Sequence, residues 1–176
     1  NINGNIFMTK QNTITNYILE VDGRLKTAIG IFESMNNTYD ELIKLLKNQL
    51  KEIAQKRDLL LEFDLDRYDR YTGFSFLFSN DKQRSFNIRF EWDRNYIREG
   101  YYGFTYPKGK KNIQLEEIFS KSLGIYNHSE DWPWYKSLDK YHNFDNRTYL
   151  DLQNGEFSIY VENKLVELLD SSIDIK

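Results

Sequence analysis

The acidic residues of this chain are the ones whose spacing most resembles that of a metal-binding or catalytic site. Glu62, Asp64 and Asp66 alternate along one expected strand, so they share one face, where carboxylate oxygens could hold a hard cation such as Mg²⁺. The competing interpretation is the solvated outer face of an edge strand, where acidic residues also oppose pairing with another strand. We favour this second interpretation and predict no metal site there.

A second acidic pattern lies towards the C-terminal end of the sequence. Glu162 and Lys164, with an upstream acid at Asp145 or Asp151, are the residue types with which restriction-type nucleases hold a metal and polarise a phosphodiester. Such a site needs Glu-x-Lys at the end of a strand, whereas apolar residues recur at helical steps over residues 157–168. We therefore predict no catalytic or metal-binding residue in this segment.

Other nucleophiles and phosphate-binding loops are missing from the sequence. The chain has no Cys, which excludes disulfides, zinc–thiolate sites and a cysteine nucleophile within it. Its two histidines, His128 and His142, fall in a polar, irregular segment, and there is no Gly-x-Ser-x-Gly elbow. The glycine and lysines of residues 107–111 lack the spacing of a P-loop. We predict neither a histidine-based catalytic site nor a cofactor in this chain.

Lysines on an expected helix and in a basic turn are candidates for contacts with phosphate, although a solvated surface is the simpler interpretation. They are Lys44, Lys47, Lys51, Lys108, Lys110 and Lys111. With 24 Lys and Arg against 27 Asp and Glu, the chain has a formal net charge of −3. This balance argues against a protein that coats nucleic acid by bulk charge, so any such contact would be local.

The most unusual segment is Asp-Trp-Pro-Trp-Tyr-Lys at residues 131–136. Three aromatic rings around one proline form either a plug for the core, since each ring buries on the order of 150–250 Å², or a recognition surface. We favour the plug. In the alternative, Trp134 would stack on bases beside Lys136, and both residues are kept as binding candidates.

Hydrophobic spacing predicts the N-terminal elements that position these residues. Apolar residues at steps of three and four predict a helical hairpin over residues 9–57, broken at Asn36-Asn37, with a capping box from Thr38 to Glu41. From residue 59 the period changes to 2, which predicts four strands up to residue 106. Short turns such as residues 79–82 and 93–95 make these strands an antiparallel meander.

The remaining sequence predicts a C-terminal helical and aromatic region over residues 113–172. A short helix over residues 114–123 ends at Gly124, and an irregular segment over residues 125–147 follows. A last helical stripe runs over residues 147–170, with an interruption at Asn154-Gly155. We expect one α+β domain over residues 1–176, in which the long helical hairpin packs on the four-stranded meander.

Composition sets the broad class of the protein. The chain has 176 residues, of which 40% are hydrophobic and 16% aromatic, which is enough to bury a core and excludes disorder for most of it. No apolar run is long enough to span a membrane, and the N-terminal residues lack the layout of a signal peptide. We expect a cytoplasmic protein that does not contact membranes.

Four short phrases, taken in order, resemble a known family. They are Arg-Phe-Glu-Trp at 89–92, Tyr-Tyr-Gly-Phe at 101–104, Trp-Pro-Trp-Tyr-Lys at 132–136 and Asn-Phe-Asp-Asn at 143–146, before a closing amphipathic helix. Over about residues 85–170 the chain resembles the C-terminal region of a bacterial group in the PD-(D/E)XK nuclease superfamily. The resemblance implies a DNA-related role and a metal-binding nuclease core upstream. Residues 1–80 show no such core, so Mg²⁺ is expected only if a core exists elsewhere.

Together these patterns predict a non-catalytic accessory or recognition domain. Its expected partners are DNA, an upstream nuclease domain or a partner protein, and the missing initiator Met agrees with a piece of a longer protein. Two alternatives stay open. One is a stand-alone Mg²⁺-dependent nuclease that uses Glu162, Lys164 and an upstream acid, and the other is a protein-interaction module whose long helices self-associate.

Overall fold

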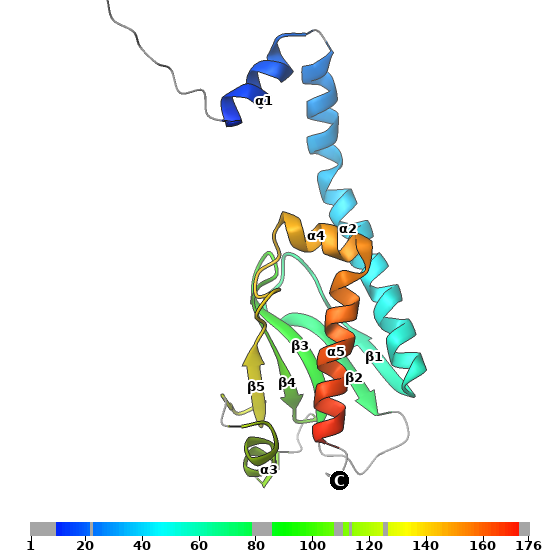
Figure 1. Cartoon of the computed structure of the whole chain (residues 1–176), viewed down its shortest axis with the longest axis vertical. Helices are drawn as coiled ribbons and strands as arrows, with labels where there is room; N and C mark the ends of the chain where they lie inside the picture. The colour runs from blue at the N-terminus through cyan, green and yellow to red at the C-terminus, as the bar shows by residue number, and fades with distance from the viewer. Residues whose placement is uncertain are drawn as a thin grey trace, which may run out of the picture. The chain divides into compact units, whose positions relative to one another are not determined.

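The computed structural model describes residues 10–21, 23–78, 86–107, 111–112, 114–124 and 127–172. Five helices and five strands lie within them (Figure 1), which confirms the α+β class. The helices are α1 (Lys10–Leu19), α2 (Arg24–Lys56), α3 (Gln114–Leu123), α4 (Asn146–Asn154) and α5 (Glu156–Ser171). The strands are β1 (Leu59–Phe63), β2 (Thr72–Phe78), β3 (Asn87–Arg94), β4 (Arg98–Thr105) and β5 (Trp134–Ser137).

The chain divides into two compact units, residues 1–41 and 42–176. In the first unit α1 and α2 meet near Gly23, whose φ of 91° is a left-handed conformation that glycine adopts without strain. The predicted break at Asn36-Asn37 is wrong, because α2 continues through both residues. The Thr38 hydroxyl donates to the Ser34 carbonyl one turn earlier, so it does not cap a new helix.

The apolar residues of α2 differ between its two halves. Those in the second unit, such as Leu46, Leu50 and Ile53, are buried in the core. Those in the first unit are exposed or half-buried, and Phe32 reaches 80% exposure. The side chains of the expected hairpin that pack on the sheet therefore come from the second half of α2.

The sheet has five antiparallel strands in the order β1-β2-β3-β4-β5. Its first four strands form the predicted meander, although the predicted turn at residues 79–82 lies outside the described residues. The fifth strand corrects the expected irregular segment, because residues 134–137 pair with β4. Four residues are too few to show an alternation of period 2, which is why spacing alone did not indicate β5.

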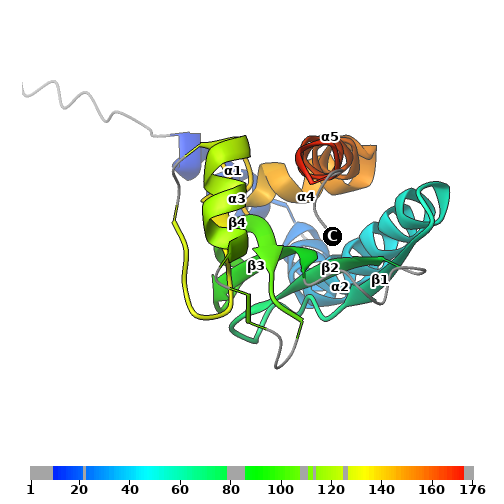
Figure 2. The ribbon, with the colours of Figure 1, turned by 90° about the horizontal axis from the view of Figure 1, so that it is seen from below.

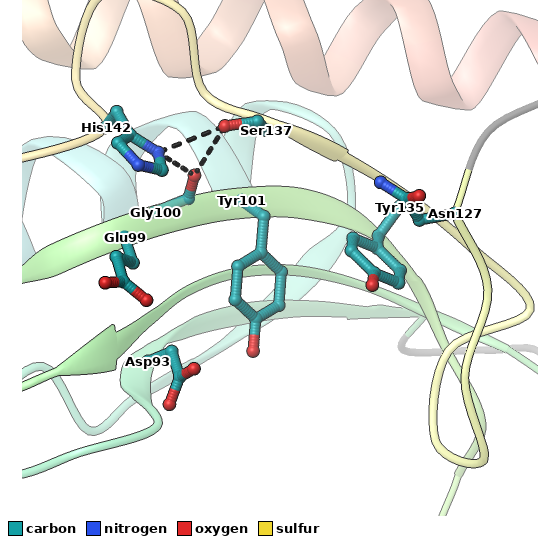
Figure 3. A pocket seen from close by; sticks show the side chains of 8 residues that line it. All are labelled: Asp93, Glu99, Gly100, Tyr101, Asn127, Tyr135, Ser137 and His142. Atoms are coloured by element: carbon teal, nitrogen blue, oxygen red, sulfur yellow. Dashed lines mark hydrogen bonds between the residues drawn. The ribbon is translucent and has the colours of Figure 1, made fainter.

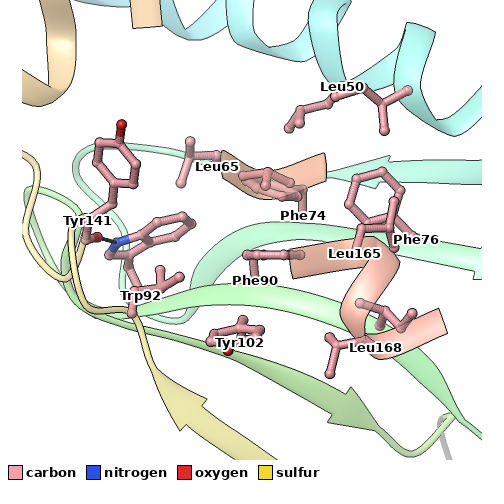
Figure 4. Close-up of a cluster of buried hydrophobic side chains, with 14 of the residues drawn as sticks. Leu50, Leu65, Phe74, Phe76, Phe90, Trp92, Tyr102, Tyr141, Leu165 and Leu168 are labelled. Atoms are coloured by element: carbon pink, nitrogen blue, oxygen red, sulfur yellow. Dashed lines mark hydrogen bonds between the residues drawn. The ribbon is translucent and has the colours of Figure 1, made fainter. Parts of the chain in front are cut away.

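One face of the sheet carries the core. Phe74, Phe90 and Tyr102 lie opposite one another on β2, β3 and β4 and stack with ring centroids 5.1 and 5.7 Å apart. Leu50 of α2 and Leu165 of α5 lie over this row (Figure 4). Figure 2 shows α3 and α5 on the same side of the sheet. Helices therefore cover this face.

The C-terminal elements follow the local signals in the sequence. Helix α3 occupies the predicted residues and Gly124 follows it with a φ of 90°. Gly155, with a φ of 79°, separates α4 from α5 at the expected interruption. Asp145 caps α4 through the backbone N–H of Thr148, at 2.8 Å. Among the described residues, none of the helices has the length and apolarity needed to cross a membrane.

Candidate functional site

The second face of the sheet, away from the helices, is polar and aromatic. Glu91 is paired with Gly73 and Tyr101, and Arg89 with Ser75 and Gly103, so these residues point away from the core row. Acidic strand residues on this face are Glu62, Glu91, Asp93 and Glu99, against the base Arg89. We call this surface the open face.

A largely buried ion pair lies at the centre of the open face. The Nε of Arg89 donates to the Oε2 of Glu91 at 2.6 Å, and the two side chains are only 16% and 12% exposed. The other guanidinium donors meet Asp64, Ser75 and the Tyr71 carbonyl at 3.0–3.2 Å. Burial opposes the charge of Arg89, but its bonds with Asp64 and Glu91 prevail and raise its pKa. All five guanidinium N–H groups are thus used inside the domain.

Tyr101 extends this network towards the pocket described next. Its hydroxyl donates to the Oε1 of Glu91 at 2.6 Å. Burial and this bond to a carboxylate raise the pKa of Tyr101 far above its ordinary value. The phenol therefore stays protonated at neutral pH and its ring is fixed in position.

An open pocket of about 360 Å³ lies beside Tyr101 (Figure 3). It takes its walls from the ends of β3 and β4, from β5 and from residues on either side of β5. The lining residues are Asp93, Glu99, Gly100, Tyr101, Asn127, Tyr135, Ser137 and His142. Pairing of β4 with β5 is what brings the two halves of this wall together.

Ser137 and His142 lie close together in the pocket wall, where both contact the Gly100 carbonyl. The Nδ1 of His142 is 3.0 Å from the Ser137 hydroxyl and 3.1 Å from the Gly100 carbonyl. The Gly100 carbonyl also accepts from the backbone N–H of Leu138 at 2.9 Å, so it has a donor in either tautomer of His142. The three groups hold the pocket wall in place.

The carboxylates of the pocket are paired with exposed arginines. Arg70 donates to Asp93 at 3.0 Å, and Arg94 donates to Glu99 at 3.1 Å. These arginine side chains are 45% and 53% exposed, so solvent screens each pair and it contributes little stability. A cationic ligand could therefore compete with Arg94 for Glu99, whereas Arg70 also donates to the backbone carbonyl of Asp93 and to the Tyr71 hydroxyl.

The predicted lysine candidates are found on the surface where they are described. Lys44, Lys47 and Lys51 are exposed on α2, and the Nζ of Lys47 lies 5.5 Å from the centre of the Phe63 ring. Lys111 is also exposed. Lys108 and Lys110 lie outside the described residues.

Trp134 of the aromatic segment is a plug for the core, as favoured from its sequence, whereas Tyr135 lines the pocket of the open face. Trp134 is 1% exposed, contacts Phe104 and Tyr102 with its ring, and donates its indole N–H to the Gly124 carbonyl at 3.3 Å. Its assignment as a base-stacking candidate is wrong for this reason. Lys136 is half-buried on β5, opposite Tyr102.

The acidic residues that alternate along the first strand have separate surroundings and do not gather into one site. Asp64 pairs with Arg89, while Asp66 accepts from the backbone N–H of Tyr68 at 2.8 Å. Glu62 is exposed on β1. Within the described ranges, no group of three or more His, Cys, Asp and Glu residues could hold a metal ion.

The Glu-x-Lys pattern lies on α5, as its helical spacing predicts. Glu162 pairs with Arg57 at 2.8 Å and Lys164 with Glu167 at 2.9 Å. On α4, Asp151 accepts from Lys140 at 2.8 Å and from the Tyr141 hydroxyl at 2.9 Å. Each member of the pattern therefore has a partner of its own.

We predict that Asp151→Asn lowers the free energy of unfolding at pH 7 by about 1.5–3 kcal/mol, since it weakens charged hydrogen bonds at a buried site. Lys140, and then Tyr141, lower the pKa of Asp151 in the folded state. This stabilisation is complete above the carboxyl pKa of the unfolded chain, about 4, and is lost as the pH falls through the lower folded value. Urea unfolding at pH 7 and pH 3 should therefore show a smaller pH dependence in the variant. Glu117→Gln, at an exposed pair, is the control, and an equal effect of both substitutions would contradict the prediction.

Sequence reasoning missed the pocket because its residues share no local motif. Asp93 and Tyr101 come from the adjacent strands β3 and β4, whereas Ser137 and His142 lie much later in the chain and join them only through the β4–β5 pairing. One signal in the sequence is Gly103, because a glycine within a strand indicates either a bulge or the close approach of another backbone. A Cβ there would overlap the backbone oxygen of Trp134 in β5, so the second case applies.

Comparison of the chain with models of protein families, with curated proteins and with solved structures gives no match. The resemblance to the PD-(D/E)XK group thus stays a prediction.

Proposed function

We propose that the chain is a non-catalytic recognition module whose open face binds a cationic side chain, Arg or Lys, of a partner protein. The observation that carries this proposal is the composition of the pocket. Two carboxylates, Asp93 and Glu99, and the Gly100 carbonyl lie beside the Tyr101 and Tyr135 rings. Carboxylates and aromatic faces together are the groups that attract ammonium and guanidinium ions.

The charge of the open face supports a cation over an anion as the ligand. Arg89 is the base at the centre of this face, and its donors are already used by Asp64, Glu91, Ser75 and Tyr71. An anion would therefore meet carboxylates without a free guanidinium to bind it. A cation would meet carboxylates whose present partners, Arg70 and Arg94, are exposed to solvent.

The aromatic part of the pocket is ordered before any ligand arrives. The Tyr101 ring contacts Trp132 and Tyr135, with centroids 5.0 and 5.3 Å away, and Glu91 holds its hydroxyl. A ligand then loses little affinity to the ordering of these side chains. This rigidity is the property expected of a recognition surface.

The test is a titration of the ¹⁵N-labelled full chain with N-acetyl-arginine amide and N-acetyl-lysine amide, followed by amide chemical shifts. We expect saturable shifts around the pocket, with dissociation constants on the order of 1 mM or weaker, as suits one side chain. Asp93→Asn should weaken binding about fivefold, equivalent to about 1 kcal/mol. Asp170→Asn removes an exposed carboxylate from α5 and should change nothing. Equal shifts with N-acetyl-glutamate amide, or unchanged binding by Asp93→Asn, would contradict the proposal.

A second candidate, DNA binding, is favoured by the exposed lysines of α2. Lys44, Lys47 and Lys51 recur at steps of three and four, so they form one basic row. The same titration with a short DNA duplex separates the two candidates. Chemical-shift changes that decline with salt, and that vanish when the three lysines are changed to Glu, would support DNA binding. If the parent chain shows no shift changes with the duplex, DNA binding is excluded.

A further inference from the structure

Two arginines lie opposite each other at the end of the β3–β4 hairpin, next to the pocket. Arg94 ends β3 and Arg98 begins β4, and the register of the sheet pairs them directly. Cβ atoms of such a pair lie about 4.5–5.5 Å apart, and like charges in this arrangement are unfavourable. Both side chains are exposed. We call these two residues the arginine pair.

One pocket carboxylate, Glu99, balances the charge of the arginine pair. Its Oε2 accepts from the Nε of Arg94 at 3.1 Å, and Glu99 follows Arg98 directly in the chain. In the part of the chain that the structure describes, Arg98 has no ion pair of its own. The second pocket carboxylate, Asp93, is held by Arg70. Glu99 is therefore shared between two guanidinium groups.

The backbone fixes the position of this hairpin end. The N–H of Phe144 donates to the Ile97 carbonyl at 2.9 Å, and the N–H of Gly100 donates to the His142 carbonyl at 2.8 Å. Ile97 and Glu99 have φ values of 54° and 58°, a left-handed conformation that is costly for a β-branched residue. Such strain persists only where the surrounding structure holds it. The arginine pair therefore stays face to face when a ligand binds.

We infer that the partner segment bound by the pocket carries an acidic residue, Asp or Glu, within two positions of its Arg or Lys. The inference rests on the function proposed above. A ligand cation that binds Glu99 displaces Arg94, which leaves the arginine pair without its shared carboxylate. A carboxylate next to the ligand cation replaces it, because guanidinium groups bind carboxylates through charge-assisted hydrogen bonds.

The short spacing between the two ligand charges follows from the geometry of an extended segment. Side chains two residues apart in an extended chain point to the same side, about 6–7 Å apart. Glu99 is adjacent to Arg98 and within hydrogen-bond distance of Arg94, so both guanidinium groups begin close to the bound cation. A ligand acid at this spacing reaches them, whereas a distant acid does not.

The test compares two pairs of peptides in titrations of the ¹⁵N-labelled full chain. The first pair is acetyl-Arg-Ala-Asp amide and acetyl-Arg-Ala-Asn amide, and the second is acetyl-Asp-Ala-Arg amide and acetyl-Asn-Ala-Arg amide. In at least one pair the acidic peptide should bind about threefold more tightly, which is the gain expected from one exposed ion pair. N-acetyl-arginine amide serves as the reference for the cation alone.

Variants of the arginine pair should affect the two kinds of probe differently. Arg94→Gln releases Glu99 from its own partner, so N-acetyl-arginine amide should bind about twofold more tightly, while the gain from the acid falls. A folding defect would not strengthen binding. Arg98→Gln should also reduce the gain from the acid, without weakening the binding of N-acetyl-arginine amide. Lys56→Gln removes the same charge at the opposite end of the sheet, where β1 begins, and should change neither.

The possible failures of the two proposals are distinguishable. Equal affinities within both peptide pairs, with N-acetyl-arginine amide still bound, would overturn this inference and leave the proposed function standing. If none of the probes binds, both are wrong. A gain from the acid that persists in both Arg94→Gln and Arg98→Gln would place the ligand carboxylate on another group, which also contradicts the inference.

Discussion

Replacement of Arg89 by Met is expected to lower the free energy of unfolding by about 3–5 kcal/mol. The substitution leaves Glu91 as a buried carboxylate without its cationic partner, and breaking a buried ion pair on one side costs about this much. The two side chains are joined at 2.6 Å and are mostly withdrawn from water. Urea unfolding followed by far-UV circular dichroism measures the loss.

The double variant Arg89→Met with Glu91→Leu should recover most of this stability. Replacing both partners of a buried pair by apolar residues of similar size is often neutral or stabilising. The control is Lys121→Met, which breaks the exposed pair with Glu117 and should leave stability nearly unchanged. A single Arg89→Met variant as mild as this control would show that the pair is not desolvated.

The same double variant separates stability from recognition. Removing Glu91 also removes the acceptor of the Tyr101 hydroxyl, so the pocket loses the bond that fixes this ring. The double variant should fold nearly as well as the parent but bind the arginine probe more weakly. We infer that the ion pair is present to hold Tyr101 in position, since an apolar pair would serve stability as well.

Gly103→Ala should destabilise the domain by about 3 kcal/mol, at the upper end of typical overpacking costs. A Cβ at this position would overlap the Trp134 oxygen and approach the Tyr135 Cα to 2.7 Å. Both atoms belong to the backbone of β5, so the strand must move away from β4. Urea unfolding gives the cost, and the pocket residues on β5 should lose their binding to the arginine probe at the same time.

A matched substitution distinguishes this clash from the ordinary effect of an added methyl group. Gly30→Ala, in the N-terminal part of α2, places a Cβ where no atom outside the local helix backbone lies within 4 Å. There the change should favour the helix by roughly 1 kcal/mol. If Gly103→Ala were as well tolerated as Gly30→Ala, the close β4–β5 approach would be wrong.

Signals that act within a few residues predicted their elements well. Gly124 ends α3 and Gly155 separates α4 from α5, because a residue with positive φ terminates a helix whatever surrounds it. Thr38 and Glu41 also matched a local signal, the capping box, but the helix continued through them. The apolar spacing before and after residue 36 has one phase, and this longer pattern prevailed over the local one.

The candidate site could be predicted only in part, because it depends on the pairing of distant segments. The lysines of α2 are exposed, as expected from their spacing on a polar helix face. The burial of Trp134 was harder to predict from the sequence. Its neighbours, a proline and a lysine, are compatible with both a buried and an exposed ring, and only the pairing of β5 decides between the two. His142 reaches the pocket through the carbonyl of Gly100, a contact that no local spacing indicates.

The order of the sheet and its covering helix along the chain has a consequence for synthesis. Strands β1 to β4 are neighbours in sequence and can pair early, but Leu165, which covers Phe74 and Phe90, follows about 60 residues after β4. At about 5–20 residues per second, a ribosome takes on the order of 3–12 s to add them. During this interval the nascent meander has the cover of α2 but not that of α5, so part of its row of aromatic rings stays exposed to solvent until α5 emerges.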